Sequence, residues 1–74
     1  MKSLINIKSG YSAAIVFIHG GRGAQHRLCE LGLLPGERIA MLQNSGVGPV
    51  TISVKGSKLS IGHGLAQKII VREE

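Results

Sequence analysis

The sequence predicts a mainly β fold, a small barrel of about five short strands with one short helix and one helical turn. Glycine makes up 11 of the 74 residues, and runs of β-branched and apolar residues stand between the glycines. This pattern is typical of short strands separated by turns. Only residues 24–31 have the apolar spacing of a regular helix. A chain of this length needs most of its residues for one core, so we expect a single domain over residues 1–74.

Five segments have the composition or the alternation of strands. Residues 50–54 are the clearest, because apolar and polar side chains alternate there and predict one buried side. Residues 20–23 and 44–48 are rich in glycine and are expected to be flexible connections. The expected strands are residues 11–19, 37–43 and 49–54, a return strand through Leu59 and Ile61 after a hairpin turn, and residues 69–71. Closing so short a sheet removes exposed edges, which favours an SH3-like barrel.

The helix is expected over residues 24–31, and a single helical turn over residues 62–67. Ala24, Leu28 and Leu31 fall at positions i, i+4 and i+7 of the helix and are expected to form its buried stripe.

Two glycines after the helix are expected to be structural. Gly32 follows the helical pattern directly and can end the helix in the left-handed conformation. Pro35 and Gly36 suit the second and third positions of a type II turn. Because a Cβ opposes both conformations, we expect Gly32→Val to lower stability more than it alters the surface.

The composition excludes several classes of function. All four acids are glutamates, and only Glu30 and Glu37 lie inside the chain, so pairs of catalytic carboxylates and oxygen-rich metal cages have little to be built from. Residues 20–23 read GGRG and lack the lysine and hydroxyl of a phosphate-binding loop. With no G-x-S-x-G elbow and no aspartate to orient a histidine, we expect no enzymatic activity.

Localisation is expected to be cytoplasmic. The single cysteine, Cys29, forms no internal disulfide. The longest apolar run, residues 13–18, is far below the ~20 residues that span a bilayer, so no membrane insertion is expected. The chain reads as a whole gene product without a signal peptide.

The net charge of +5 permits an anionic partner. The basic residues are spread from Lys2 to Arg72, and the only aromatic residues are Tyr11 and Phe17. Nucleic-acid-binding barrels usually supply aromatic platforms and a basic footprint, so a solubilising surface is the favoured interpretation and a nucleic-acid-binding barrel the alternative.

His26 and Cys29 are candidate metal ligands. They lie three residues apart on the expected helix and therefore on one face, and imidazole and thiolate both bind zinc or iron. Two ligands do not complete a tetrahedral site. The expectation is therefore no cofactor, with weak transition-metal binding as the alternative. We expect added zinc or ferrous iron to leave the NMR signals of both side chains in place.

Several motifs together resemble one family. The segment RLCELGLLPGERI, residues 27–39, resembles the R-L-x-x-L-G-[LI]-x-P-G-x-x-[IV] motif of FeoA-type proteins. The segments GPV at residues 48–50, LSIG at 59–62 and AQKIIV at 66–71 are similar to the family's later motifs. The family often has an aspartate before the proline of its G-D-P motif. Here that stretch reads GVGP, so no role of that acid is carried over.

The resemblance implies an SH3-like fold and a role in bacterial ferrous-iron uptake. It implies a small cytoplasmic partner of FeoB, a membrane transporter with a G domain, lying at the inner membrane through that partner. A similar domain is implied in iron-dependent repressors of the diphtheria-toxin type, which leaves a metal-responsive regulator as a further alternative. Leucines beside charges are typical of docking patches, and the expected contact residues are Arg22, Arg27, Leu33, Leu34, Pro35 and Arg38.

Overall fold

The computed structural model describes residues 1–74 and contains one sheet of six antiparallel strands. The elements in chain order are β1 (Lys2–Ser3), the short 3-10 helix η1 (Leu4–Asn6), β2 (Ser12–Ile18), α1 (Gly21–Glu30), β3 (Arg38–Gln43), β4 (Val50–Val54), β5 (Ser57–Ile61), α2 (His63–Gln67) and β6 (Ile69–Glu73). The strand absent from the sequence prediction is β1. Two residues are too few to show an alternation, and β1 exists because it pairs with β6.

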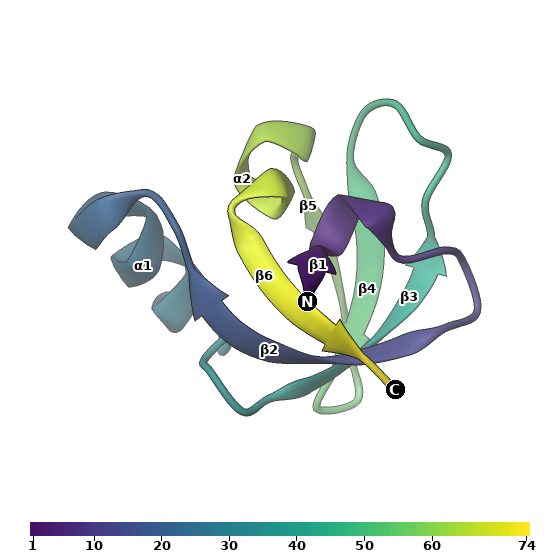
Figure 1. Cartoon of the computed structure of the whole chain (residues 1–74), viewed down its shortest axis with the longest axis horizontal. Helices are drawn as coiled ribbons and strands as arrows, with labels where there is room; N and C mark the ends of the chain where they lie inside the picture. The colour runs from purple at the N-terminus through teal and green to yellow at the C-terminus, as the bar shows by residue number, and fades with distance from the viewer.

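The strands curl into the predicted SH3-like barrel, in the order β1-β6-β2-β3-β4-β5 (Figure 1). No ladder joins β1 to β5, so the full closure expected from the sequence is not formed and two edges are left. One edge is only two residues long and the other carries the exposed Lys58. Short edges and edge lysines both discourage pairing with another chain, so the fold tolerates these two edges.

The core lies inside the curl of the sheet and confirms the alternation in β4. Val50, Ile52 and Val54 are buried, and the two polar residues between them are half-buried. Sixteen buried apolar residues form one cluster, to which all the longer strands contribute. Helix α1 lies outside this curl, beyond the end of β2 (Figure 1).

Helix α1 differs from the sequence prediction at both ends. It begins at Gly21, so the glycine-rich segment predicted to be a connection forms its first turn. The first N–H groups of a helix have no partner inside it, and poor helix formers are least harmful there. At the other end Leu31 is the C-cap and is 44% exposed, so its predicted place in the buried stripe is wrong. The buried side of α1 consists of Ala24 and Leu28.

Candidate functional site

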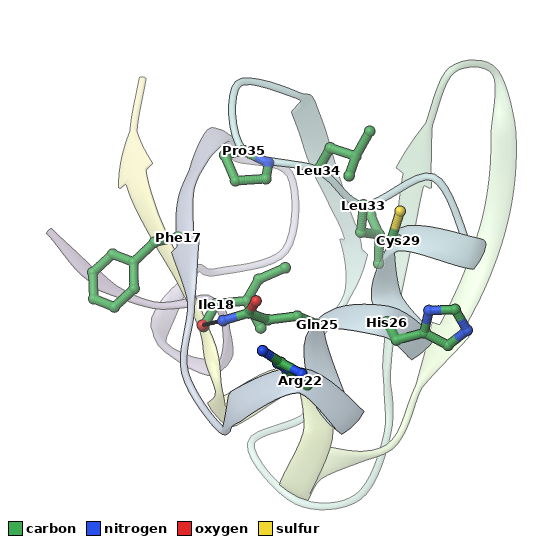
Figure 2. Close-up of a pocket in the computed structure, with 9 residues that line it drawn as sticks. All are labelled: Phe17, Ile18, Arg22, Gln25, His26, Cys29, Leu33, Leu34 and Pro35. Carbon is green, nitrogen blue, oxygen red and sulfur yellow. Dashed lines mark hydrogen bonds between the residues drawn. The ribbon is translucent and has the colours of Figure 1, made fainter.

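The most pronounced hollow of the surface is a groove between α1, the end of β2 and the turn that follows α1. Its volume is about 570 Å³, and five of the nine residues that line it are hydrophobic. Figure 2 shows these residues arranged around the hollow. They are Phe17, Ile18, Arg22, Gln25, His26, Cys29, Leu33, Leu34 and Pro35. We refer to these nine residues as the α1 groove.

The α1 groove has a buried apolar floor and an exposed rim. Ile18 and Leu33 are buried members of the core and form the floor. Phe17 and Leu34 are 43% and 42% exposed, and together with Pro35 they give the rim an apolar part. In Figure 2 the Phe17 ring lies at one side of the hollow and the His26 ring at the opposite side. Exposed apolar side chains around a concave surface are typical of a docking site.

The end of α1 places one leucine in the floor and the next in the rim. The Gly32 N–H donates to the Cys29 carbonyl at 2.9 Å, and the Leu33 N–H donates to the Leu28 carbonyl at 2.9 Å. Gly32 has a φ of +87°, and this pair of hydrogen bonds is a Schellman motif. The motif turns Leu33 back onto Leu28, and the following residue, Leu34, is left facing solvent.

The turn that carries Leu34 and Pro35 is fixed against β2. The Glu37 N–H donates to the Leu34 carbonyl at 3.0 Å, and Gly36 has a φ of +95°, as a type II turn requires. The Gly36 N–H also donates to the Ile15 carbonyl at 2.8 Å. This wall of the groove is therefore held by backbone hydrogen bonds and is pre-organised.

Helix α1 supplies the opposite wall from residues at i, i+3, i+4 and i+7. These are Arg22, Gln25, His26 and Cys29, and they share a face that is distinct from the buried face of Ala24 and Leu28. The Gln25 side-chain N–H donates to the Ile18 carbonyl at 3.2 Å, which ties the helix to the end of β2 (Figure 2). Both walls are thus tied to β2, the turn at Ile15 and the helix at Ile18, and this fixes their spacing.

The structure brings together some of the predicted contact residues and separates the others. Arg22, Leu33, Leu34 and Pro35 line the groove. Leu33 has no exposed area, so its prediction as a surface contact is wrong, because the Schellman motif directs it into the core.

Arg27 and Arg38 lie outside the groove. Arg27 is five residues beyond Arg22, about 140° around the helix axis. Arg38 begins β3, and its Nε donates to the Glu74 carboxylate at 2.8 Å. Neither side chain is placed to act together with Leu34.

The candidate metal ligands His26 and Cys29 both line the groove, and Cys29 is an exposed free thiol. The nearest acid is Glu30, whose Oε2 lies 3.7 Å from His26 Nε2. No group of three or more histidine, cysteine or acidic side chains is arranged to hold a metal ion.

Sequence reasoning missed three groove residues, Phe17, Ile18 and Gln25. The available signal was the unbroken apolar run of residues 13–18, which indicates a strand with apolar side chains on both sides. One of those sides covers the core. The other side, with Phe17, is left partly exposed at the groove.

Comparisons with known proteins agree with the fold. The family model of the FeoA domain matches residues 2–73. A protein of Methanocaldococcus jannaschii named "Putative Fe(2+) transport protein A" is 40% identical over 73 residues, covering 99% of this chain and 88% of that protein.

Two solved structures are similar over nearly the whole chain. The crystal structure of an iron uptake regulatory protein, FeoA, is 38% identical, with a TM-score of 0.92, and the match covers 97% of this chain and 96% of that chain. The zinc complex of Stenotrophomonas maltophilia FeoA, described as a procaryotic SH3 domain protein, is 22% identical with a TM-score of 0.82, covering 97% of this chain and 91% of that one. The second likeness supports the SH3-like fold.

Proposed function

Because the chain belongs to the FeoA family, we propose that it is an accessory protein of ferrous-iron uptake that binds the cytoplasmic part of an FeoB-type transporter and modulates it. The observation that carries the proposal is the α1 groove, a concave, apolar and pre-organised surface. Such a surface suits the side chains of another protein. The proposed role is one of binding, without catalysis.

The proposed site of action is the cytoplasmic side of the membrane, which the chain reaches through its partner. None of the helices is both long and apolar enough to cross a membrane. In this role the groove accepts a segment of the transporter, and the fixed spacing of its walls lowers the ordering cost of binding. No resident metal takes part in the proposed interaction.

The test is a pulldown of the transporter's cytoplasmic G domain by the purified chain, without nucleotide and with guanosine diphosphate or a non-hydrolysable triphosphate analogue. Leu34→Asp removes an apolar side chain from the rim, and we expect it to weaken binding about tenfold or more, as at an interface hot spot. Leu42→Asp is the matched control, because Leu42 is also 42% exposed but does not line the groove.

The rate of GTP hydrolysis by the transporter provides the second measurement. We expect this rate to change when the chain is added and the change to be lost with Leu34→Asp, whereas Leu42→Asp retains it. Absence of binding in every nucleotide state would refute the proposal. Equal losses with the two leucine variants would refute the groove as its site.

A further inference from the structure

The ion pairs of the chain leave a marked imbalance of charge at the α1 groove. Three of the four glutamates lie within 4 Å of a lysine or arginine, in the pairs Glu73 with Lys2, Glu74 with Arg38 and Glu37 with Lys55. The fourth, Glu30, lies 3.7 Å from His26 Nε2 and does not line the groove. Arg22 lines the groove and has no such partner, and no carboxylate is among the lining residues. The groove therefore presents an apolar surface with an uncompensated cation at its rim.

The local sequence makes Arg22 more conspicuous. It lies in the first turn of α1, where the helix dipole disfavours a cation and favours an anion. The first turn holds no acidic residue, and no side chain caps the helix. A local rule of helix stability is thus broken without a compensating contact inside the chain, which is typical of residues kept for an external partner.

A second free cation lies near this turn. The Lys68 side chain packs so closely over Gly20 that a Cβ on Gly20 would be 2.8 Å from Lys68 Cδ and 3.3 Å from Lys68 Nζ. Lys68 also has no carboxylate within ion-pair distance. Two cations therefore lie at the same end of α1.

We propose that the α1 groove binds a segment of the transporter that carries apolar side chains next to carboxylates, with the apolar side chains in the groove and a carboxylate on Arg22. This inference rests on the proposed function and specifies the chemistry of the partner's segment. The exposed apolar side chains of Phe17, Leu34 and Pro35 account for the first requirement and Arg22 for the second. An Arg–carboxylate pair is often bidentate, so it fixes orientation as well as adding affinity.

Charge argues against the other occupants of the groove. A second copy of the chain also carries a net charge of +5, and three of its four glutamates are already paired with lysine or arginine, so it is a poor source of acid for Arg22. A nucleic acid needs a row of cations along its phosphates, but the groove has a single arginine and an apolar floor.

The test uses overlapping peptides of about 15 residues that cover the cytoplasmic part of the transporter, a length at which isolated helices begin to form. Binding of each labelled peptide to the full chain is measured by fluorescence anisotropy. We expect the peptides that bind to combine apolar residues with glutamate or aspartate. Arg22→Glu should weaken their binding about ten- to hundredfold, the range for loss of a charged hydrogen bond.

Lys58→Glu is the matched control. Lys58 is an exposed, unpaired cation on β5 and lies outside the groove, and its variant has the same net charge as Arg22→Glu. If charge acted only in a general way, peptide binding to the two variants would be weakened equally, and that result would overturn the proposal.

Exchanging the bound peptide's glutamate for lysine is a second test. The exchange should restore binding to the Arg22→Glu variant only. Arg22→Glu places an acid in the first helical turn, so the melting temperature should not fall.

The outcomes separate the two proposals. If the whole transporter binds but the binding peptides are not acidic, or Arg22→Glu binds as tightly as the parent, this inference fails and the proposed function stands. If neither the transporter nor any peptide binds, the proposed function fails and this inference fails with it. An Arg22-dependent dimer of the chain, or duplex DNA that displaces the peptides, would also overturn the inference.

Discussion

Gly32 determines how the chain leaves α1 and so which leucine faces solvent. Its φ of +87° belongs to the left-handed region, and a Cβ built there would meet nothing within 4 Å. The requirement for glycine is therefore one of backbone conformation and not of space. An L-residue pays about 1–2 kcal/mol for this conformation.

We expect Gly32→Ala to lower the free energy of unfolding by about 1–2 kcal/mol. In a domain of this size each 1 kcal/mol corresponds to about 4–8 °C in melting temperature. Gly23→Ala is the matched control, because Gly23 lies in α1 without a positive φ and also has open space at its Cβ. Alanine is the better helix former, so this control should leave the melting temperature unchanged or raise it. A Gly32→Ala protein that melts at the parent's temperature would contradict the requirement.

Single residues also show where sequence reasoning stops. The pattern of a helix followed by Gly32 predicts the left-handed turn, and the structure has that turn. Which of Leu33 and Leu34 is buried depends on how the Schellman motif aims the chain at the core, and apolar periodicity does not contain that direction. The three arginines predicted to contact a partner are all exposed in the structure. Only one of them, Arg22, lines the same groove as Leu34.

Among the elements, the connection between β3 and β4 is held more firmly than its glycine content predicts. The Asn44 side-chain amide donates to the carbonyls of Ile5 and Ile7, at 2.9 and 2.8 Å. Its Oδ1 accepts from the Gly46 N–H at 3.1 Å. One side chain therefore joins the start of this connection to the segment around η1. Sequence reasoning missed the link because Asn44 and its partners are more than 35 residues apart.

We expect Asn44→Asp to destabilise the protein by about 1–3 kcal/mol. The carboxylate has no N–H to donate, so the carbonyls of Ile5 and Ile7 lose their partner. Ser45→Ala is the control, since the Ser45 hydroxyl makes only an exposed bond to the Val47 carbonyl, and we expect a change within about 0.5 kcal/mol. Urea denaturation measures both values, and hydrogen exchange of the Ile7 amide reports the local loosening. Equal stability of the two variants would show that Asn44 does not hold the two elements together.

The boundaries of the elements show the same limit of sequence reasoning. Each predicted strand is present, with ends that differ by a residue or two, because alternation and turn residues are local signals. Helix α1 begins earlier than predicted, at Gly21, because glycines are tolerated in the first turn and helix propensity does not mark this boundary. The α1 groove required the relative placement of α1, β2 and the turn at Pro35, which no local pattern encodes.

For the molecule as a whole, the arrangement of charge matters more than its sum. Six of the nine basic residues have no acidic partner within 4 Å. These six are Lys8, Arg22, Arg27, Lys58, Lys68 and Arg72. They come from α1, the edge strand β5, β6 and two connections, and no one of these segments carries more than two of them. We therefore expect the net charge of +5 to repel a second copy and not to act as a phosphate-binding track.

Salt dependence distinguishes this arrangement from that of a nucleic-acid-binding barrel. A protein that neutralises Z phosphates of duplex DNA loses affinity with a slope of about −0.9Z in a plot of log K against log salt. We expect no measurable binding of a mixed-sequence duplex at about 150 mM salt, where the Debye length is about 8 Å and scattered charges act separately. Binding of the transporter's cytoplasmic part should weaken much less steeply with salt, because one or two charge pairs at Arg22 and Lys68 are screened without the release of condensed counterions. Isothermal titration at three salt concentrations measures both quantities. A steep slope for DNA that is reduced by Arg72→Ala and Lys8→Ala as much as by Arg22→Ala would show instead that the charge acts as one surface.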